Sequence, residues 1–262
     1  MHALSTAATG MAAQQMNVDV ISNNIANMNT VGYKRQVAQF SDLLYQDQDQ
    51  VGSQSDSSGT IVPTGLQVGS GVKAGSIYRI TQQGSMTQTG NTLDLAIQGT
   101  GYLQVQLPSG ETAYTRAGNL AVNNTGEIVT SQGYPVLPAI TVPAGATNLV
   151  ISQSGLVSAT VPGQTTPQTL GQMQLASFIN EAGLEGLGDN LWQVSGASGP
   201  AVVGQPAQNG LGTLLQGYTE ASNVDAVSEV TNLIEAQRAY EMNSKVITTA
   251  DQMLSTTVQE KS

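Results

Sequence analysis

The chain has 262 residues, with 8 Lys or Arg against 18 Asp or Glu, so its formal net charge at pH 7 is −10. An acidic chain cannot neutralise a phosphate backbone, so we expect no nucleic-acid partner. Cysteine is absent and the only histidine is His2. This excludes disulfides and cysteine nucleophiles and leaves little material for metal or acid/base sites. We expect no catalytic, cofactor-binding or metal-binding residues.

Residues 4–28 predict an amphipathic helix. The segment has no proline and a single glycine, and its apolar residues recur every seven positions in two registers, interrupted once by Gln14. A period of 3.5 residues is typical of a helix with a narrow coiled-coil seam. The predicted seam consists of Leu4, Ala7, Met11, Val18, Ile21, Ile25 and Met28.

Residues 222–262 predict a second helix of the same kind. Ser222 followed by Asp225 resembles a capping box at its start. Its predicted seam consists of Val230, Leu233, Ala236, Tyr240, Ile247, Ala250 and Leu254, with Ile234 beside it. Each helix would be about 25–35 residues long, or about 40–50 Å, which is too long for a small domain to cover. We predict that the helices pair with each other or with other chains, and that the seams form an assembly interface.

The middle of the chain predicts an antiparallel β domain. Residues 93–107 alternate between apolar and polar side chains, and Gly-, Asn- and Pro-rich turns follow every eight to twelve residues. Residues 46–60 contain one apolar residue among Gln, Asp, Ser, Thr and Gly, so we expect them to be extended or flexible in the free chain. Residues 127–129 and 149–151 alternate in the same way as residues 93–107. Residues 143–167 and 196–212 are loop-rich, and we expect them at the surface.

The predicted fold class is therefore α+β. Residues 1–30 and 222–262 form a discontinuous, coiled-coil-like helical domain. Residues 31–92 and 212–221 form an extended connecting arm with a polar insertion at 46–65, and residues 93–211 form the β domain.

Signals for chemistry are weak. Gly99-Thr100-Gly101 has neither the spacing nor the following helix of a phosphate loop, so a strand turn is favoured. The sequence pairs none of the candidate carboxylates, and most of them stand where solvated turn residues would stand: Asp94, Glu111, Glu127, Glu181, Glu185 and Asp189. Tyr33-Lys34-Arg35 is a local basic cluster, which either contacts acid on a neighbouring subunit or lies in a solvated loop. A secreted, carboxylate-dependent wall hydrolase and a non-polymerising secreted adhesin remain alternatives.

Four stretches, taken together, resemble the signatures of the bacterial flagellar rod and hook protein family. They are residues 22–34, residues 93–102, residues 114–118 with Gly126, Val129 and Gly133, and residues 220–225 with 236–245. The signature residues of the two ends are Asn24, Ile25, Ala26, Asn27, Gly32, Tyr33, Ser222, Asn223, Arg238, Tyr240 and Asn243. Within the family, the chain length, residues 65–72 and the polar insertion before them favour the distal rod over the hook and the proximal rod.

The resemblance implies a non-enzymatic structural subunit that polymerises into a rigid, hollow drive shaft. Paired terminal helices would line the tube, and the β domain would face outward. It also implies a place in the basal body, export through the flagellar type III apparatus without a cleaved signal peptide, and no cofactor. The implied partners are further copies of the chain, proximal rod proteins, the hook or its junction, and the peptidoglycan and outer-membrane rings.

Overall fold

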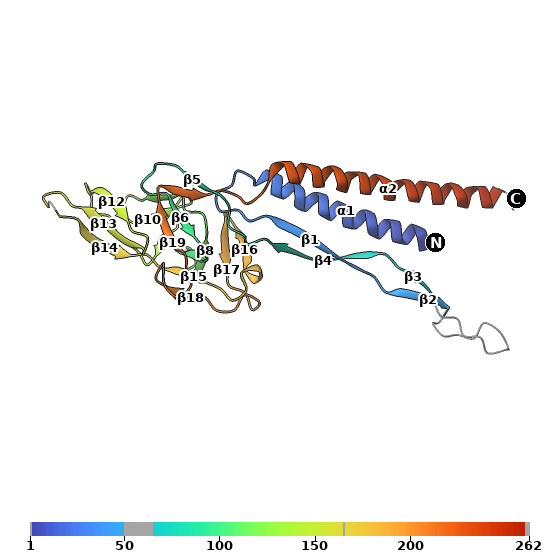
Figure 1. Ribbon diagram of the computed structural model, residues 1–262, viewed down its shortest axis with the longest axis horizontal. Coiled ribbons are helices and arrows are strands. Elements are labelled where there is room, and N and C mark those ends of the chain that lie inside the picture. Colours follow the sequence, from blue (N-terminus) through green and yellow to red (C-terminus); the bar gives the residue numbers. More distant parts are fainter. Residues whose placement is uncertain (1, 50–64, 165, 260–262) are drawn as a thin grey trace. The chain divides into compact units, whose positions relative to one another are not determined.

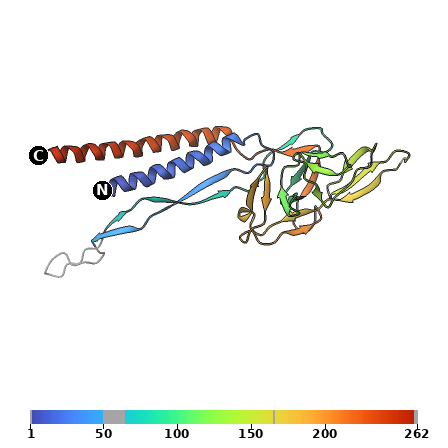
Figure 2. The same cartoon turned by 180° about the vertical axis from the view of Figure 1, so that it is seen from behind.

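The computed structural model describes residues 2–49, 65–164 and 166–259. The chain forms two compact units. Unit 1 comprises residues 1–26, 36–78 and 225–262, and unit 2 comprises residues 27–35 and 79–224. The two terminal helices and the antiparallel strands between them give an α+β fold, as predicted; Figures 1 and 2 show these elements from opposite sides.

The elements of unit 1 are α1 (His2–Ala26), β1 (Gln36–Asp42), β2 (Tyr45–Asp49), β3 (Leu66–Gly69), β4 (Val72–Arg79, whose last residue belongs to unit 2) and α2 (Ala226–Gln259). The elements of unit 2 are β5 (Met86–Gln88), β6 (Leu95–Gln98), β7 (Tyr102–Gln106), β8 (Thr112–Thr115), β9 (Leu120–Val122), β10 (Ile128–Thr130), β11 (Val136–Leu137), β12 (Thr147–Ile151), β13 (Leu156–Thr160), β14 (Gln168–Gln172), β15 (Leu175–Ser177), the 3₁₀ turn η1 (Glu181–Gly183), β16 (Glu185–Gly188), β17 (Leu191–Gln193), β18 (Val202–Gly204), β19 (Thr213–Gln216) and β20 (Tyr218–Glu220).

The start of α2 differs from the predicted capping box. The helix begins at Ala226, so Ser222 as the cap was wrong. Oδ1 of Asp225 accepts hydrogen bonds from the backbone N–H groups of Val227 (2.9 Å) and Ser228 (3.3 Å). Asp225 is therefore the N-cap, and its carboxylate also lies at the positive end of the helix dipole.

In unit 1, α1 and α2 lie side by side and run antiparallel. The end of α1 meets the start of α2 at Asn24 and Glu229, and the start of α1 lies beside Val246. Gly10 permits a close approach, because a Cβ there would lie 2.8 Å from Nδ2 of Asn243. The buried apolar residues of the two helices are mostly small: Ala7, Ala13, Val20, Ile21 and Ala236. The two helices thus contact each other within one chain, whereas coiled-coil geometry stays a prediction.

Two strand pairs complete unit 1. β1 pairs with β4, and β2 pairs antiparallel with β3, with Tyr45 opposite Gly69. Residues 46–49 of the predicted polar insertion belong to β2, and its residues 50–64 lie outside the described residues. Within the described ranges, no helix has both the length and the apolarity that crossing a membrane requires.

Unit 2 contains several sheets, and the largest of them, the central sheet, has the strand order β16-β17-β8-β7-β15-β18; β11 also pairs with β7. The pairs whose register is resolved are all antiparallel, which confirms the predicted antiparallel β region. The main apolar core of unit 2 is made almost entirely of aliphatic side chains, among them Leu95, Ile97, Leu103, Val105, Ile128, Leu175 and Leu214. A smaller cluster stacks Tyr102 and Tyr114 edge-on against Phe178.

The residues of the turns explain why one prediction for unit 2 was right and another was wrong in part. Gly99-Thr100-Gly101 joins β6 to β7 as a strand turn, with φ of 106° at Gly99 and 133° at Gly101. The expectation of loop-rich segments at 143–167 and 196–212 was wrong in part, because β13 and β18 lie within them, whereas β12 contains the strand predicted at 149–151. β13 and β18 are short and are surrounded by Gly, Pro and Thr, so the composition of their turns hid them.

Candidate functional site

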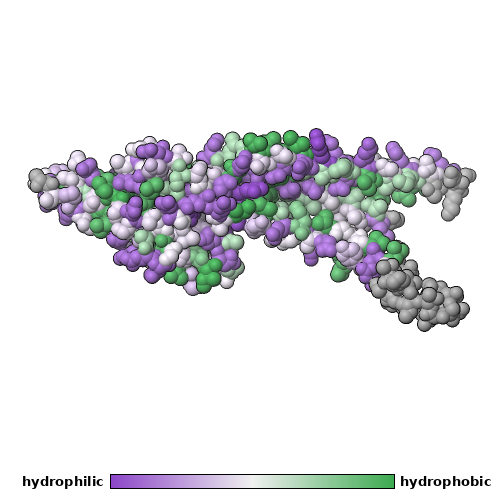
Figure 3. Space-filling model, in the orientation of Figure 1, coloured by the Kyte–Doolittle hydropathy of each residue, from purple (hydrophilic) through white to green (hydrophobic). Residues whose placement is uncertain are grey.

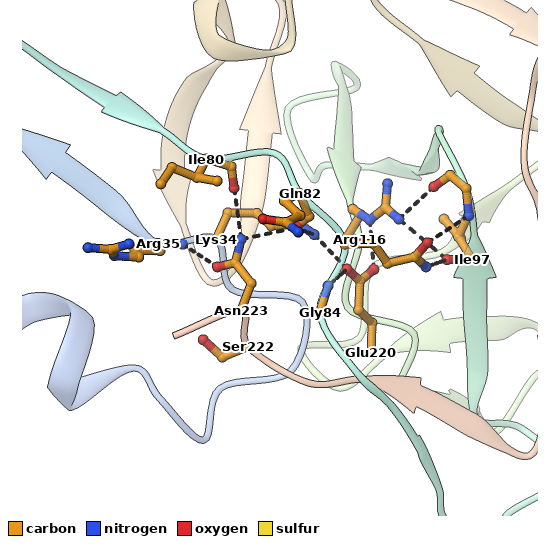
Figure 4. Close-up of polar contacts among 12 residues, drawn as sticks. Lys34, Arg35, Ile80, Gln82, Gly84, Ile97, Arg116, Glu220, Ser222 and Asn223 are labelled. Atoms are coloured by element: carbon orange, nitrogen blue, oxygen red, sulfur yellow. Dashed lines mark hydrogen bonds and ion pairs between the residues drawn. The ribbon is translucent and has the colours of Figure 1, made fainter. Parts of the chain in front are cut away.

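A buried cluster of three charged side chains lies in unit 2 (Figure 4). Glu220, at the end of β20, is 1% exposed, and Lys34 and Arg116 are each 4% exposed. Nζ of Lys34 lies 2.5 Å from Oε1 of Glu220, and Nε of Arg116 lies 2.7 Å from Oε2. One carboxylate is therefore the counter-charge for two cations, in a chain of which only 10% of the residues are charged.

The local backbone brings these side chains together. The N–H of Gly32, at φ 71°, donates to the carbonyl of Glu220 (2.8 Å), which places Lys34 next to β20. A Cβ at Gly32 would lie 2.8 Å from the backbone of Arg116, so only glycine fits there. Oε1 of Glu220 also accepts the N–H of Gly84 (3.0 Å).

Arg116 uses the rest of its guanidinium on backbone carbonyls at the turn between β6 and β7. Nη1 donates to Gly101 (3.1 Å), and Nη2 donates to Gly99 (2.8 Å) and Ile97 (3.3 Å). A buried ion pair is favourable only when its remaining donors are satisfied in this way. The cluster is thus suited to fixing the fold rather than to chemistry on a substrate.

The pKa directions follow from this arrangement. Burial alone would raise the pKa of Glu220, but the charges of Arg116 and Lys34 outweigh it and hold the pKa below its ordinary value of 4.5. Burial lowers the pKa of Lys34, and its hydrogen bond to Glu220 opposes that shift only in part. The ionised carboxylate of Glu220 is therefore the group that compensates the buried charges of both Lys34 and Arg116.

Asn223, one of the predicted signature residues, extends the cluster. Its Oδ1 accepts the backbone N–H of Arg35 (2.7 Å), and its Nδ2 donates to the carbonyls of Ile80 (2.9 Å) and Gln82 (2.9 Å). Nζ of Lys34 donates to the same carbonyl of Gln82 (2.9 Å). One amide therefore connects three separate stretches of the chain (Figure 4).

A second buried polar cluster lies in unit 1 at Asn24, which is 1% exposed. Its Nδ2 donates to the carbonyl of Gln36 (2.8 Å), and its Oδ1 accepts the N–H of the same residue (2.9 Å). Nδ2 also lies 3.3 Å from Oε2 of Glu229, which is 1% exposed. Asn24 thus joins the end of α1 to the starts of β1 and α2.

The signature residues do not gather at a single site. Asn24 and Gly32 are buried and Asn223 is half-buried, each within a polar cluster. Asn243 faces Gly10. The others are half-buried or exposed: Ile25, Ala26, Asn27, Tyr33, Ser222, Arg238 and Tyr240.

The predicted seam residues differ in exposure. Ile21 is buried. Leu4, Met11, Val18, Ile25, Leu233 and Ile247 are half-buried, whereas Met28, Val230, Tyr240 and Leu254 are exposed. Further exposed apolar residues of α2, which the heptad pattern missed, are Val227, Met242, Val246, Met253 and Val258. Figure 3 shows part of this apolar surface along the helices.

An open groove of about 520 Å³ follows the helix pair. Its apolar lining comes from Ala3 of α1 and from Met242, Val246, Ala250 and Met253 of α2. The groove therefore continues the contact between the helices onto a part of α2 with much exposed apolar surface.

Lys34 was predicted either to contact an acidic group on a neighbouring subunit or to lie in a solvated loop. Both predictions were wrong, because Lys34 is buried and pairs with Glu220 of its own unit. Neither Glu220 nor Arg116 was singled out from the sequence, although both stand inside the quoted family stretches. For Arg116 the signal in the sequence was a single charge within the otherwise uncharged stretch 114–118. Of the six weighed carboxylates, Glu181 accepts a hydrogen bond from the hydroxyl of Tyr102 (3.1 Å) and Asp94 accepts one from Asn91 (3.0 Å). No group of three metal-ligating side chains gathers among the described residues.

Comparisons with known proteins agree with the resemblance. Residues 4–34 match the family described as "Flagella basal body rod protein", residues 96–159 match "Flagellar hook protein FlgE/F/G D1 domain", and residues 215–260 match "Flagellar basal body rod FlgEFG protein C-terminal".

Curated relatives match over nearly the whole chain. The flagellar basal-body rod protein FlgG of Caulobacter vibrioides is 66% identical over 262 residues, which is 100% of both chains. The proteins of the same name from Agrobacterium fabrum and Bacillus subtilis are 50% and 41% identical, each covering 97% of both chains. This chain belongs to the flagellar basal-body rod protein family.

Proposed function

We propose that the chain is a structural subunit of the flagellar basal-body rod, and specifically of its distal part. The observation that carries the proposal is the 66% identity, over the full length of both chains, to a flagellar basal-body rod protein FlgG. The satisfied charge cluster at Glu220 and the apolar surface of α2 are consistent with a structural role rather than an enzymatic one.

In the proposed assembly, residues 1–30 and 222–262 line a hollow helical tube. Residues 31–92 and 212–221 connect them to residues 93–211, which face outward. A head-to-tail contact that does not close on itself gives such a filament. The tube would transmit torque and carry the export channel, with the proximal rod, the hook and the rings as neighbours.

The free energy of assembly would come from apolar surface that a single chain leaves exposed. Val230, Tyr240 and Leu254 are 46%, 41% and 48% exposed. Covering apolar surface stabilises a contact by about 25 cal/mol per Å². Contacts with neighbouring copies would therefore complete helices that have incomplete packing in the free subunit.

The test is electron microscopy of concentrated protein, in which the wild type is expected to form tubes. Leu254→Asp places a charge on the exposed seam and is expected to abolish tube formation, without changing the melting of unit 2. Gln252→Asp is the matched control, because position 252 lies about 200° around the same helix from position 254.

Leu233→Asp and Ile25→Asp are expected to abolish tubes as well. Absence of tubes from concentrated wild-type protein would contradict the proposal. Normal tubes from Leu254→Asp would show instead that the seam is wrongly assigned.

A further inference from the structure

Four peptide bonds carry the chain between the two units, after residues 26, 35, 78 and 224. Each lies at the end of one of three segments of unit 2: residues 27–35, residues 79–88 and residues 218–224. We call these three segments the latch. Every connection begins or ends in the latch. The mobility of the latch segments therefore determines how freely the connections can move.

The latch is bonded internally from segment to segment. The N–H of Ile80 donates to the carbonyl of Arg35 (2.9 Å), and the N–H of Ala221 donates to Ser85 (2.8 Å). β20 pairs with β5, and the two strands form a sheet of their own, separate from the central sheet. The Gly32, Gly84 and Asn223 contacts described above add to this set.

The Glu220 carboxylate contacts all three segments. Glu220 itself belongs to residues 218–224. Its carboxylate forms an ion pair with Lys34 of residues 27–35 and accepts a hydrogen bond from the N–H of Gly84 of residues 79–88. Its second oxygen faces Arg116, which is held by carbonyls of the turn between β6 and β7. Removing this one group would leave two buried cations without their counter-charge.

The latch has little apolar packing of its own. None of its residues belongs to the two buried apolar clusters of unit 2. The strands β7 and β8, in contrast, lie inside the central sheet and contribute Leu103, Val105 and Ala113 to the main core. Segments held by polar contacts open at lower free energy than segments held by an apolar core.

We propose that Glu220 closes a latch that fixes all four connections between the two units, and that the latch opens as one body while the central sheet stays folded. When closed, it makes the connections stiff. When open, it frees them without unfolding unit 2.

Native-state hydrogen exchange of the full-length wild-type protein, over a series of low urea concentrations, tests the opening. Amides of residues 31–35, 80–88 and 218–221 are expected to share one exchange rate and one urea dependence, both distinct from those of β7 and β8. Exchange of the latch segments at unrelated rates, or only together with the central sheet, would overturn the proposal.

Glu220→Gln tests the role of the carboxylate. Exchange in the latch is expected to become about a hundredfold faster or more, while β7 and β8 stay much better protected than the latch. Glu220→Asp, which retains the charge, is expected to restore part of the protection. The matched control is Glu185→Gln, the same change at an exposed residue of unit 2. Exchange of β7 and β8 at the same rate as the latch in Glu220→Gln would show that the central sheet opens together with the latch and would overturn the proposal.

Stiffness can be measured directly because the chain has no cysteine. Spin labels on cysteines introduced at the exposed residues Gln237 of unit 1 and Ser109 of unit 2 report the distance distribution between the units. Glu220→Gln is expected to broaden this distribution relative to the wild type and to Glu185→Gln. If the latch amides exchange faster in Glu220→Gln but the distance distribution keeps its width, the latch does not control the stiffness of the connections, and that part of the proposal is overturned.

Discussion

Glu220 shows how strongly stability can depend on one charge when few others are near. Its carboxylate is almost completely buried between Lys34 and Arg116. Removing one partner from a buried ion pair costs about 3–5 kcal/mol, because the charge left behind stays buried without compensation. Removing the charge of an exposed carboxylate of unit 2, such as Glu185, should change the free energy of unfolding much less.

The pH dependence of unit 2 should carry the signature of this residue. The pKa of Glu220 is lower in the folded protein than its ordinary value of 4.5. Its contribution to the free energy of unfolding is therefore complete above that value and is lost as the pH falls through the folded pKa. The free energy of unfolding at each pH can be measured by urea unfolding followed by the fluorescence of Trp192, the only tryptophan.

Glu220→Gln should have a lower free energy of unfolding than the wild type at pH 7, and the difference should shrink toward acid pH. Glu185→Gln should follow the wild type throughout. A constant difference between Glu220→Gln and the wild type, from pH 7 to acid pH, would contradict the assignment.

Gly118 provides a second test at the scale of one residue. A Cβ at this position would lie 1.6 Å from the carbonyl oxygen of Leu95, whose N–H donates to the carbonyl of Gly118 (2.8 Å). Gly118→Ala must therefore displace the backbone at the start of β6, and we expect a loss of about 3 kcal/mol or more in the free energy of unfolding of unit 2. Gly196→Ala is the control, because nothing lies within 4 Å of its added Cβ. Equal stabilities of the two variants in urea unfolding would refute the close approach.

At the scale of elements, Asn24 holds α1, β1 and α2 together through a buried amide. Both hydrogen-bonding ends of the amide are used, one as a donor and one as an acceptor. A carboxylate of the same shape would lose the donor and would face the carboxylate of Glu229. The amide is therefore required for its chemistry and not for its size.

Asn24→Asp is accordingly expected to destabilise unit 1 by about 1–3 kcal/mol at pH 7. Thermal loss of the helical circular dichroism signal should occur at a lower temperature than in the wild type. Asn17→Asp, the same change at a half-buried position of α1, should have a smaller effect. A larger effect at position 17 would mean that Asn24 does not hold the three elements together.

The elements with a long apolar period were the most predictable from sequence. The seven-residue pattern located α1 and α2 to within a few residues, because a stripe over many turns is a strong signal. The start of α2 was misplaced, because Ser222 and Asp225 are both good caps and only the fold decides between them. The cluster at Glu220 was out of reach, since it joins residues 34, 116 and 220 through contacts that no local pattern records.

At the scale of the molecule, the two units differ in what they bury. The buried apolar residues of α1 and α2 are small, mainly alanine and valine, whereas unit 2 has a continuous core of leucine, isoleucine and valine. The division of residues 36–78 from residues 79–224 follows from tertiary contacts and had no compositional marker.

The units should therefore unfold at different temperatures in the unassembled protein. The helical circular dichroism signal, which comes from unit 1, is expected to be lost first, and the fluorescence of Trp192 in unit 2 is expected to change several degrees higher. Coincident transitions would contradict this order. Scans at two protein concentrations exclude a contribution from assembly.

Because α1 runs antiparallel to α2, His2 and Gln259 both lie toward the end of unit 1 that carries the apolar groove. Affinity tags or fluorescent fusions on either terminus would therefore crowd the same surface, and swapping the tag from one terminus to the other would not relieve a defect in motility. The exposed turn between β7 and β8 is a better insertion point, since Gly110 there has no neighbour within 4 Å of an added Cβ.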